Sequence, residues 1–165
     1  MSLLVLGLNH RTAPIEVREH IVFDAERLPH ALASLRALPG MAESLIVSTC
    51  NRTEVYAVGG TAESVSAWLV AESGGNAALS SCLYRIEGPD AVRHAFSVAA
   101  GLDSLILGEP QILGQLKDAY RAARQAGTAG SLLNRLFQTT FAVAKRVRTE
   151  TAIGAAAVSV ASVGI

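Results

Sequence analysis

The first half of the chain alternates between short apolar runs and longer stretches with helical spacing. Four runs, at residues 2–8, 44–49, 53–58 and 83–86, are rich in aliphatic residues and end at polar or glycine positions, which predicts strands. A short helix is expected from Pro14. A second carries Leu28 and Leu32 on one face, and Thr61 can cap a third.

The order strand, helix, strand, strand, helix, strand indicates an α+β fold of the ferredoxin-like βαββαβ type. Such a fold has an antiparallel sheet with helices on one face. From Gly88 onward the pattern is helical only, with expected helices at 89–100, from Pro110 to Gly127 and from Ser131. We therefore expect one domain over 1–150, with a ferredoxin-like part (1–87) and a C-terminal helical part (88–150).

Composition narrows the class of protein. Half of the 165 residues are hydrophobic and the formal net charge is zero, which indicates an aliphatic core and excludes a disordered or strongly basic chain. Two cysteines make neither a disulfide framework nor a zinc site, so a reducing, cytoplasmic setting is expected. No segment has the length and apolarity of a membrane span, and the first residues lack the basic region of a signal peptide.

Residues 48–54 place a single thiol, Cys50, directly after an apolar run and among hydrogen-bonding and charged side chains. A nucleophilic cysteine needs such neighbours, because a cation such as Arg52 stabilises the reactive thiolate. Alternatively, Cys50 ends a core strand while Arg52 and Glu54 form a surface pair, since cysteine is often buried and inert. The local pattern leaves both interpretations open.

A second polar cluster spans 101–111, a predicted loop between two helices. In the helix that follows, Gln111, Gln115 and Asp118 share a seam beside the apolar face. They could line a polar cleft, although the spacing alone favours solvated side chains. His94 lies on a mainly apolar helix face, which favours a core histidine over a catalytic one.

Three segments, 7–14, 48–56 and 101–115, together resemble the N-terminal catalytic domain of the glutamyl-tRNA reductase family. These enzymes use NADPH to convert glutamyl-tRNA(Glu) to glutamate-1-semialdehyde, on the route to 5-aminolevulinate and tetrapyrroles. The resemblance implies that Cys50 attacks the glutamyl ester to form a thioester and that His94 is also catalytic. It implies a substrate-binding set as well, consisting of Thr49, Cys50, Asn51, Arg52, Ser104, Glu109, Pro110, Gln111 and Gln115.

Within that set, we expect Arg52 to hold the side-chain carboxylate of the glutamyl group through paired hydrogen bonds. Glu109 or an amide oxygen would then meet its α-ammonium group. The family binds NADPH in a following Rossmann domain, whereas this chain has no G-x-G-x-x-G run. Residues 151–165 are accordingly expected to be the truncated start of a linker or NADPH-binding domain. The chain would carry the thioacylation half only, with no metal.

Expected partners are glutamyl-tRNA(Glu) and the downstream aminomutase, without a membrane. The full-length protein would be a homodimer through a distant domain, and this fragment a monomer. A cationic cluster could contact RNA or be a solvated face that packs on other domains; it consists of Arg135, Lys145, Arg146 and Arg148 against Glu150.

Two other functional classes remain open from the sequence. A non-catalytic ferredoxin-like module that binds a ligand or RNA would explain the fold. A thiol redox sensor would explain Cys50, but it would usually need a second, resolving thiol. Cys82, placed in the fourth strand, is expected to serve in packing.

Overall fold

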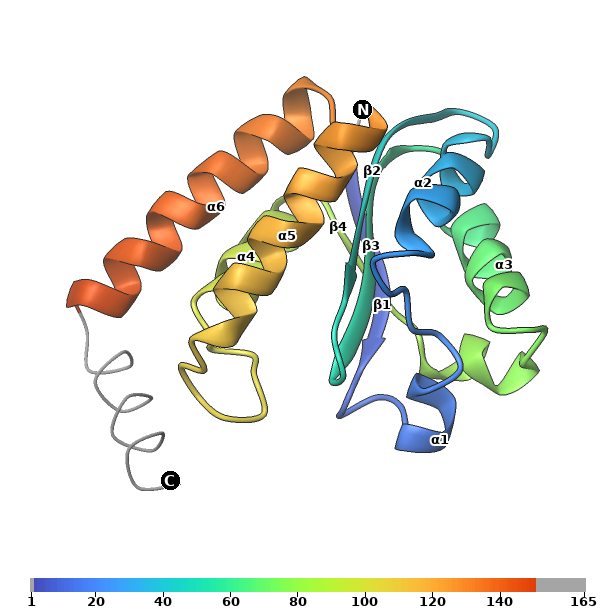
Figure 1. The fold of residues 1–165 in the computed structure, drawn as a ribbon, viewed down its shortest axis with the longest axis horizontal. Helices are drawn as coiled ribbons and strands as arrows, with labels where there is room; N and C mark the ends of the chain where they lie inside the picture. The colour runs from blue at the N-terminus through green and yellow to red at the C-terminus, as the bar shows by residue number, and fades with distance from the viewer. Residues whose placement is uncertain (1, 151–165) are drawn as a thin grey trace.

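The predicted antiparallel sheet is present in the structure, a computed structural model that describes residues 2–150 (Figure 1). Its strands are β1 (Leu3–Asn9), β2 (Met41–Ser48), β3 (Arg52–Gly59) and β4 (Tyr84–Glu87). They lie in the order β2-β3-β1-β4, and every neighbouring pair is antiparallel. This is the ferredoxin-like topology expected from the order of the elements.

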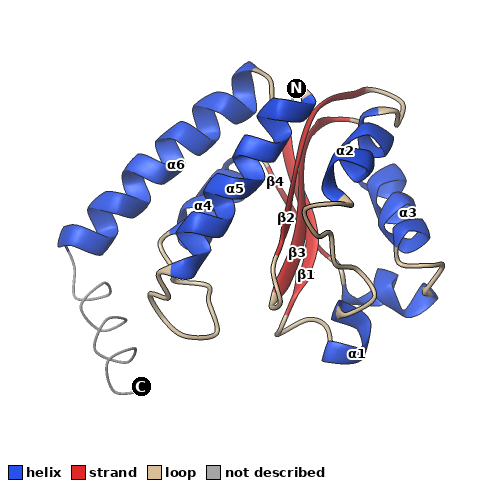
Figure 2. Ribbon diagram, viewed as in Figure 1, coloured by secondary structure: helices blue, strands red, loops and turns tan. Residues whose placement is uncertain are grey.

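Helices cover both faces of this sheet (Figure 2). On one face lie α2 (Leu28–Arg36) and α3 (Ala62–Glu72), preceded by the short α1 (Ile15–Arg18). The opposite face carries α4 (Pro89–Ala99), α5 (Gln111–Ala126) and α6 (Ser131–Glu150). The prediction of helices on one face is thus correct for the ferredoxin-like part. The C-terminal helical part covers the other face of the sheet and forms a third layer.

The two-sided cover explains why the central strand reads as a continuous apolar run. Alternate residues of β1 enter different cores: Leu3 and Val5 pack towards α4–α6, whereas Leu6 and Leu8 pack towards α2 and α3. All seven residues of β1 are buried. A strand that is buried on both faces has no reason to alternate between apolar and polar residues.

The sequence pattern predicts Cys82 in the fourth strand, but in the structure it lies before that strand. Residues before β4 form a short 3-10 helix, η1 (Ala77–Cys82), whose start is capped by the Asn76 side chain, which accepts the N–H of Ala78 at 3.1 Å. Cys82 is the last residue of this helix, and β4 begins two residues later. Cys82 packs against the core under α2 and α3, so its expected role in packing holds.

Helix ends are held partly by local and partly by distant groups. Thr61 caps α3 as expected, because its Oγ1 accepts the N–H of Ser64 at 3.1 Å. At the start of α6 the carboxylate of Glu43, on strand β2, accepts the N–H groups of Gly130 and Leu133 at 2.8 and 2.9 Å. This contact ties the last helix to the sheet edge.

Within residues 2–150, none of the helices combines the length and apolarity needed to cross a bilayer. The expectation for 151–165, a truncated linker or NADPH-binding domain, lies outside the described residues.

Candidate functional site

A cleft of about 340 Å³ opens between the β2–β3 turn, the loop that follows α4 and the first turns of α5. It brings together every residue of the predicted substrate-binding set: Thr49, Cys50, Asn51, Arg52, Ser104, Glu109, Pro110, Gln111 and Gln115. His10 and the apolar side chains of Leu105, Ile106 and Ile112 complete the lining. Segments more than 50 residues apart in sequence therefore meet in one concave site.

Cys50 lies at the tip of the turn between β2 and β3, and it is exposed. Thr49 closes this turn: its Oγ1 accepts the N–H groups of Asn51 and Arg52 at 3.2 and 3.1 Å, and its own N–H donates to the Arg52 carbonyl at 2.8 Å. A closed turn holds the thiol out of the core. Cys50 is therefore exposed and is not buried at the end of a core strand.

On the other wall of the cleft, the two ends of the loop 101–108 are joined by a hydrogen bond between two glycines. Gly108 donates its N–H to the carbonyl of Gly101 at 2.9 Å. A Cβ on Gly101, which has φ of 81°, would lie only 2.8 Å from the Gly108 Cα. Ser104 and Glu109 are positioned on either side of this closure.

Arg148 of α6 holds the same loop from behind. Its guanidinium donates to the carbonyl oxygens of Gly108, Glu109 and Ala99 at 2.9, 2.8 and 3.1 Å. Burial lowers the pKa of Arg148. Its place in the predicted cationic cluster needs correction, because this guanidinium binds the loop and does not add to a solvated face.

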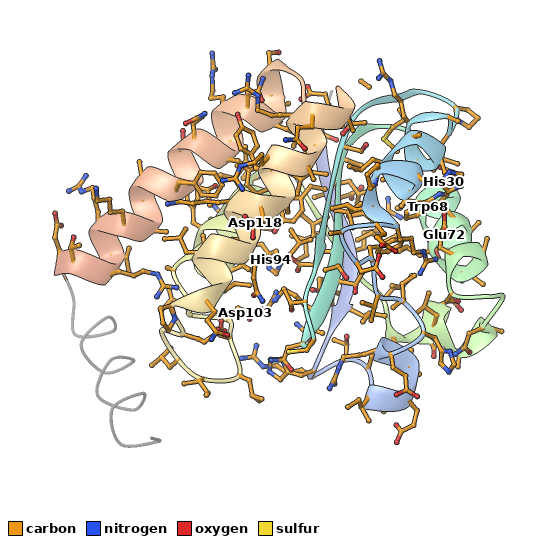
Figure 3. The ribbon with its side chains drawn as sticks, viewed as in Figure 1. His30, Trp68, Glu72, His94, Asp103 and Asp118 are labelled. Atoms are coloured by element: carbon orange, nitrogen blue, oxygen red, sulfur yellow. The ribbon has the colours of Figure 1, made fainter. Side chains whose placement is uncertain are left out.

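Gln111, Gln115 and Asp118, which share a seam of α5, do not all line the cleft. Gln111 and Gln115 line the cleft beside Cys50, so their amides can reach a bound molecule. Asp118, one turn further along, lies outside that cleft and pairs with Arg121 at 3.0 Å on the surface (Figure 3). The solvated interpretation is right for Asp118, whereas the polar-cleft interpretation is right for the two glutamines.

Arg52 and Glu54 form an ion pair, but it is buried and not on the surface. Only 2% of the Arg52 side chain is exposed, and its Nη1 lies 3.2 Å from Glu54 Oε2. Nη2 donates to the carboxylate and the main-chain oxygen of Asp103, at 2.9 and 2.8 Å. Asp103 also pairs with Arg11 at 2.8 Å. The guanidinium thus connects the sheet to the loop that forms the far wall of the cleft.

Glu54 is fully buried and collects hydrogen bonds from several side chains. His94 Nε2 and the Tyr84 hydroxyl each lie 2.5 Å from its Oε2, and the Tyr56 hydroxyl lies 3.2 Å from Oε1. Burial alone would raise the pKa of Glu54, but the hydrogen bond and charge of His94, together with the charge of Arg52, lower it to about 2. The group is therefore a carboxylate at neutral pH.

His94 is not among the residues that line the cleft, and its catalytic role stays a prediction. Its side chain, on α4 (Figure 3), is 13% exposed and its Nε2 lies against Glu54. A histidine with a buried carboxylate partner matches the core interpretation of its helix face. Glu54 and Arg52 connect His94 to the cleft.

From the sequence, Arg52 and Glu54 were considered only as a surface pair and the buried network was not predicted, although its residues follow strand spacing. Arg52, Glu54 and Tyr56 alternate along β3 and face α4–α6, where period-two spacing places them on one side of the sheet. That spacing was a usable signal. His10 was missed as well, because only the pairing of β1 with β3 brings it beside the cysteine turn.

Gly7 is the residue opposite Glu54 in the β1–β3 pairing, and it leaves room for the buried carboxylate. A Cβ there would lie 2.5 Å from the Thr53 carbonyl oxygen and 2.9 Å from Glu54 Cα. We expect Gly7→Ala to lower the free energy of unfolding by about 1–3 kcal/mol, since main-chain atoms must move. Denaturant unfolding checks this. Gly114→Ala is the control, since nothing lies within 4 Å of its added Cβ; an equal loss in both variants would contradict the expectation.

No three His, Cys, Asp or Glu side chains within residues 2–150 are grouped so that they could hold a metal ion. The functional groups that line the cleft are a thiol, an imidazole, amides, a carboxylate and a buried guanidinium.

Comparison with known proteins identifies the family of the chain. The family model described as "Glutamyl-tRNAGlu reductase, N-terminal domain" matches residues 6–151. The chain is 56% identical over all of its 165 residues to glutamyl-tRNA reductases of Stenotrophomonas maltophilia (strain K279a) and Xanthomonas campestris pv. phaseoli, and spans 38% of the length of each.

A solved structure supports the same relationship. The glutamyl-tRNA reductase from Methanopyrus kandleri aligns with a TM-score of 0.74 and 34% identity, over 90% of this chain and 35% of that one. The family match covers most of the chain and the structural match reproduces its fold. The chain therefore belongs to the glutamyl-tRNA reductase family, where it corresponds to the N-terminal domain.

Proposed function

We propose that Cys50 takes the glutamyl group of glutamyl-tRNA(Glu) as a thioester. This transfer would be the first half of the NADPH-dependent reduction to glutamate-1-semialdehyde in tetrapyrrole biosynthesis. One observation carries the proposal: the exposed thiol shares a cleft with the residues that the family resemblance assigns to substrate binding. The relatives are named for this activity, and the chain spans 38% of their length.

The chemistry of the cleft suits acyl transfer. The Cys50 thiolate attacks the ester carbonyl, a bond forms between sulfur and carbon, and the bond from carbon to the ribose oxygen breaks. The resulting thioester accepts hydride more readily than an oxygen ester does, so one difficult step becomes two easier ones. Incubation with glutamyl-tRNA(Glu), followed by intact-mass measurement at low pH, tests whether one glutamyl group is added.

Recognition of the glutamyl group needs an acceptor for its ammonium and donors for its side-chain carboxylate. Glu109 and the amide oxygens of Gln111 and Gln115 supply acceptors within the cleft. The Arg52 guanidinium is the cationic donor, but its Nη2 already holds Asp103. A bound carboxylate would therefore share this guanidinium with Asp103 or replace Asp103 on it.

Arg52→Lys is expected to slow glutamyl transfer to Cys50 by roughly ten- to a hundredfold, because a single ammonium cannot hold Glu54, Asp103 and a substrate at once. The measurement is the acylation rate with 2′(3′)-O-glutamyl-adenosine. Arg93→Lys is a matched control, since Arg93 lies on the exposed side of α4 and 70% of its side chain is accessible. Unchanged kinetics in Arg52→Lys would remove the assignment.

Hydride transfer needs a bound dinucleotide in addition to the cysteine cleft. A dinucleotide binds at the carboxyl ends of parallel strands, beside a glycine-rich turn into a helix. Strands β1–β4 pair only in antiparallel fashion, so residues 2–150 do not fit NADPH in that way. We place NADPH binding in a part of the longer protein outside the described residues.

The aminomutase is a partner that follows from the chemistry of the proposed product. Glutamate-1-semialdehyde carries a reactive aldehyde, so direct transfer to the aminomutase that consumes it is chemically advantageous. We infer a cytoplasmic setting, which suits two free cysteines. We also propose that the longer protein dimerises through residues outside this chain.

A further inference from the structure

Thioacylation needs a group that moves protons, and the cleft contains an imidazole that no part of the proposed function has used. The thiol must lose its proton before attack, and the departing ribose oxygen must gain one. His94 lies 2.5 Å from Glu54 and is not among the residues that line the cleft. Among residues 2–150, His10 is the histidine that lines the cleft together with Cys50.

Strand pairing explains why His10 lies there. β1 runs antiparallel to β3, with Leu8 opposite Thr53 and Asn9 opposite Arg52. The residue after Asn9 therefore emerges beside the Cys50 turn. Asn9 fixes the chain at that point, because its Oδ1 accepts the N–H groups of Arg11 and Thr12 at 2.9 and 3.2 Å. His10 thus projects from a turn that is held by hydrogen bonds.

The state of the ring suits proton transfer. Nδ1 of His10 is buried and has no hydrogen-bond partner among the described residues, an arrangement that is rare for a buried polar atom, so no hydrogen bond through this nitrogen fixes the ring. Burial, followed by the charges of Arg11 and Arg52, lowers the pKa of His10; Arg18 adds to this and Asp103 opposes it. The imidazole is therefore neutral at neutral pH and can accept a proton.

We propose that His10 is the proton carrier of the thioacylation step, an inference that rests on the proposed function. The imidazole takes the proton of the Cys50 thiol as sulfur bonds to the ester carbon. The imidazolium then gives that proton to the ribose oxygen as the carbon–oxygen bond breaks. The products are the thioester and the free ribose hydroxyl, and the imidazole returns to its neutral form.

The experiment compares two esters with different needs for a proton. The ribose oxygen of 2′(3′)-O-glutamyl-adenosine must be protonated to leave, whereas the 4-nitrophenolate of glutamate α-(4-nitrophenyl) ester leaves without a proton. His10→Gln should slow acylation of Cys50 by the adenosine ester by about a hundredfold or more at neutral pH. It should slow the nitrophenyl ester far less at alkaline pH, where hydroxide removes the thiol proton.

His30→Gln is the matched control, since His30 is exposed on α2, away from the cleft (Figure 3). A thermal melt reports whether each variant is folded. If His10→Gln unfolds, His10→Asn replaces it and is read in the same way. If the nitrophenyl ester at alkaline pH is slowed as much as the adenosine ester, His10 has a structural role only and the proposal is overturned; no loss with either ester overturns it as well.

The unsubstituted chain separates this proposal from the proposed function. If neither ester acylates the unsubstituted chain at Cys50, the proposed function fails and the role of His10 fails with it. If both esters acylate Cys50 but His10→Gln reacts as fast as the unsubstituted chain, only the role of His10 is overturned.

Discussion

Cys50→Ser should reduce transfer of the glutamyl group to the protein by roughly a thousandfold or more. The hydroxyl keeps the size and position of the side chain at the turn tip, but it ionises far less readily than a thiol. The cleft offers no other thiol, because Cys82 packs against the core under α2 and α3. Intact mass after incubation with 2′(3′)-O-glutamyl-adenosine measures the transfer, and release by hydroxylamine identifies a thioester.

Cys82→Ser serves as the control and should keep the full rate of transfer. Acylation that persists in Cys50→Ser, or that is lost only in Cys82→Ser, would place the nucleophile elsewhere. Alkylation under the same conditions separates the other functional classes. Selective capture of Cys50 supports a nucleophile, equal slow labelling of both thiols favours a binding module, and a Cys50–Cys82 bridge under peroxide favours a redox sensor.

Glu54→Gln should lower the free energy of unfolding by about 3–5 kcal/mol, the usual cost of removing one partner from a buried ion pair. The glutamine fills the same space, but Arg52 would retain only Asp103 as a carboxylate partner. The Tyr84 hydroxyl and His94 would also lose their charged acceptor. Denaturant unfolding at neutral pH measures the loss.

The pH dependence gives a second, independent signature of the same carboxylate. The pKa of Glu54 is about 2 in the folded chain and ordinarily 4.5. Its depressed pKa therefore contributes stability that is fully present above pH 4.5 and is lost as the pH falls towards 2. Glu54→Gln should lack this contribution and unfold with a weaker pH dependence across that range.

Glu63→Gln is the matched control, because 79% of the Glu63 side chain is exposed. An exposed ion pair contributes at most about 1 kcal/mol, so this variant should remain close to the unsubstituted chain. Equal destabilisation in both variants, or an unchanged acid transition in Glu54→Gln, would contradict the role assigned to the buried carboxylate.

Local patterns predicted most of the secondary structure because local energetics decide it. The apolar runs became β1–β4 within a few residues of the expected limits, and Thr61 caps α3 as its residue type suggested. The pattern did not predict η1, where the Asn76 side chain accepts the N–H of Ala78. Such a local hydrogen bond is difficult to weigh without coordinates.

The predicted substrate-binding residues line one cleft, and most of them lie in contiguous motifs. Residues 49–52 occupy one closed turn, and Gln111 and Gln115 lie one helical turn apart, so each group reaches the cleft together. The position of His94 relative to the cleft could not be predicted, because a helix face says only that a residue is buried. Whether a buried histidine reaches a substrate or a carboxylate depends on which strand residue α4 covers, and that residue is Glu54.

The sequence by itself determined the α+β class, the order of the elements and the thiol at the end of an apolar run. These follow from periodicity and turn chemistry, which act over a few residues. Only the tertiary structure decided that the Arg52–Glu54 pair is buried, that Arg148 binds the loop and that His10 joins the cleft. Each depends on strand pairing or helix packing between distant segments. Local periodicity does not specify which distant residue a side chain will contact.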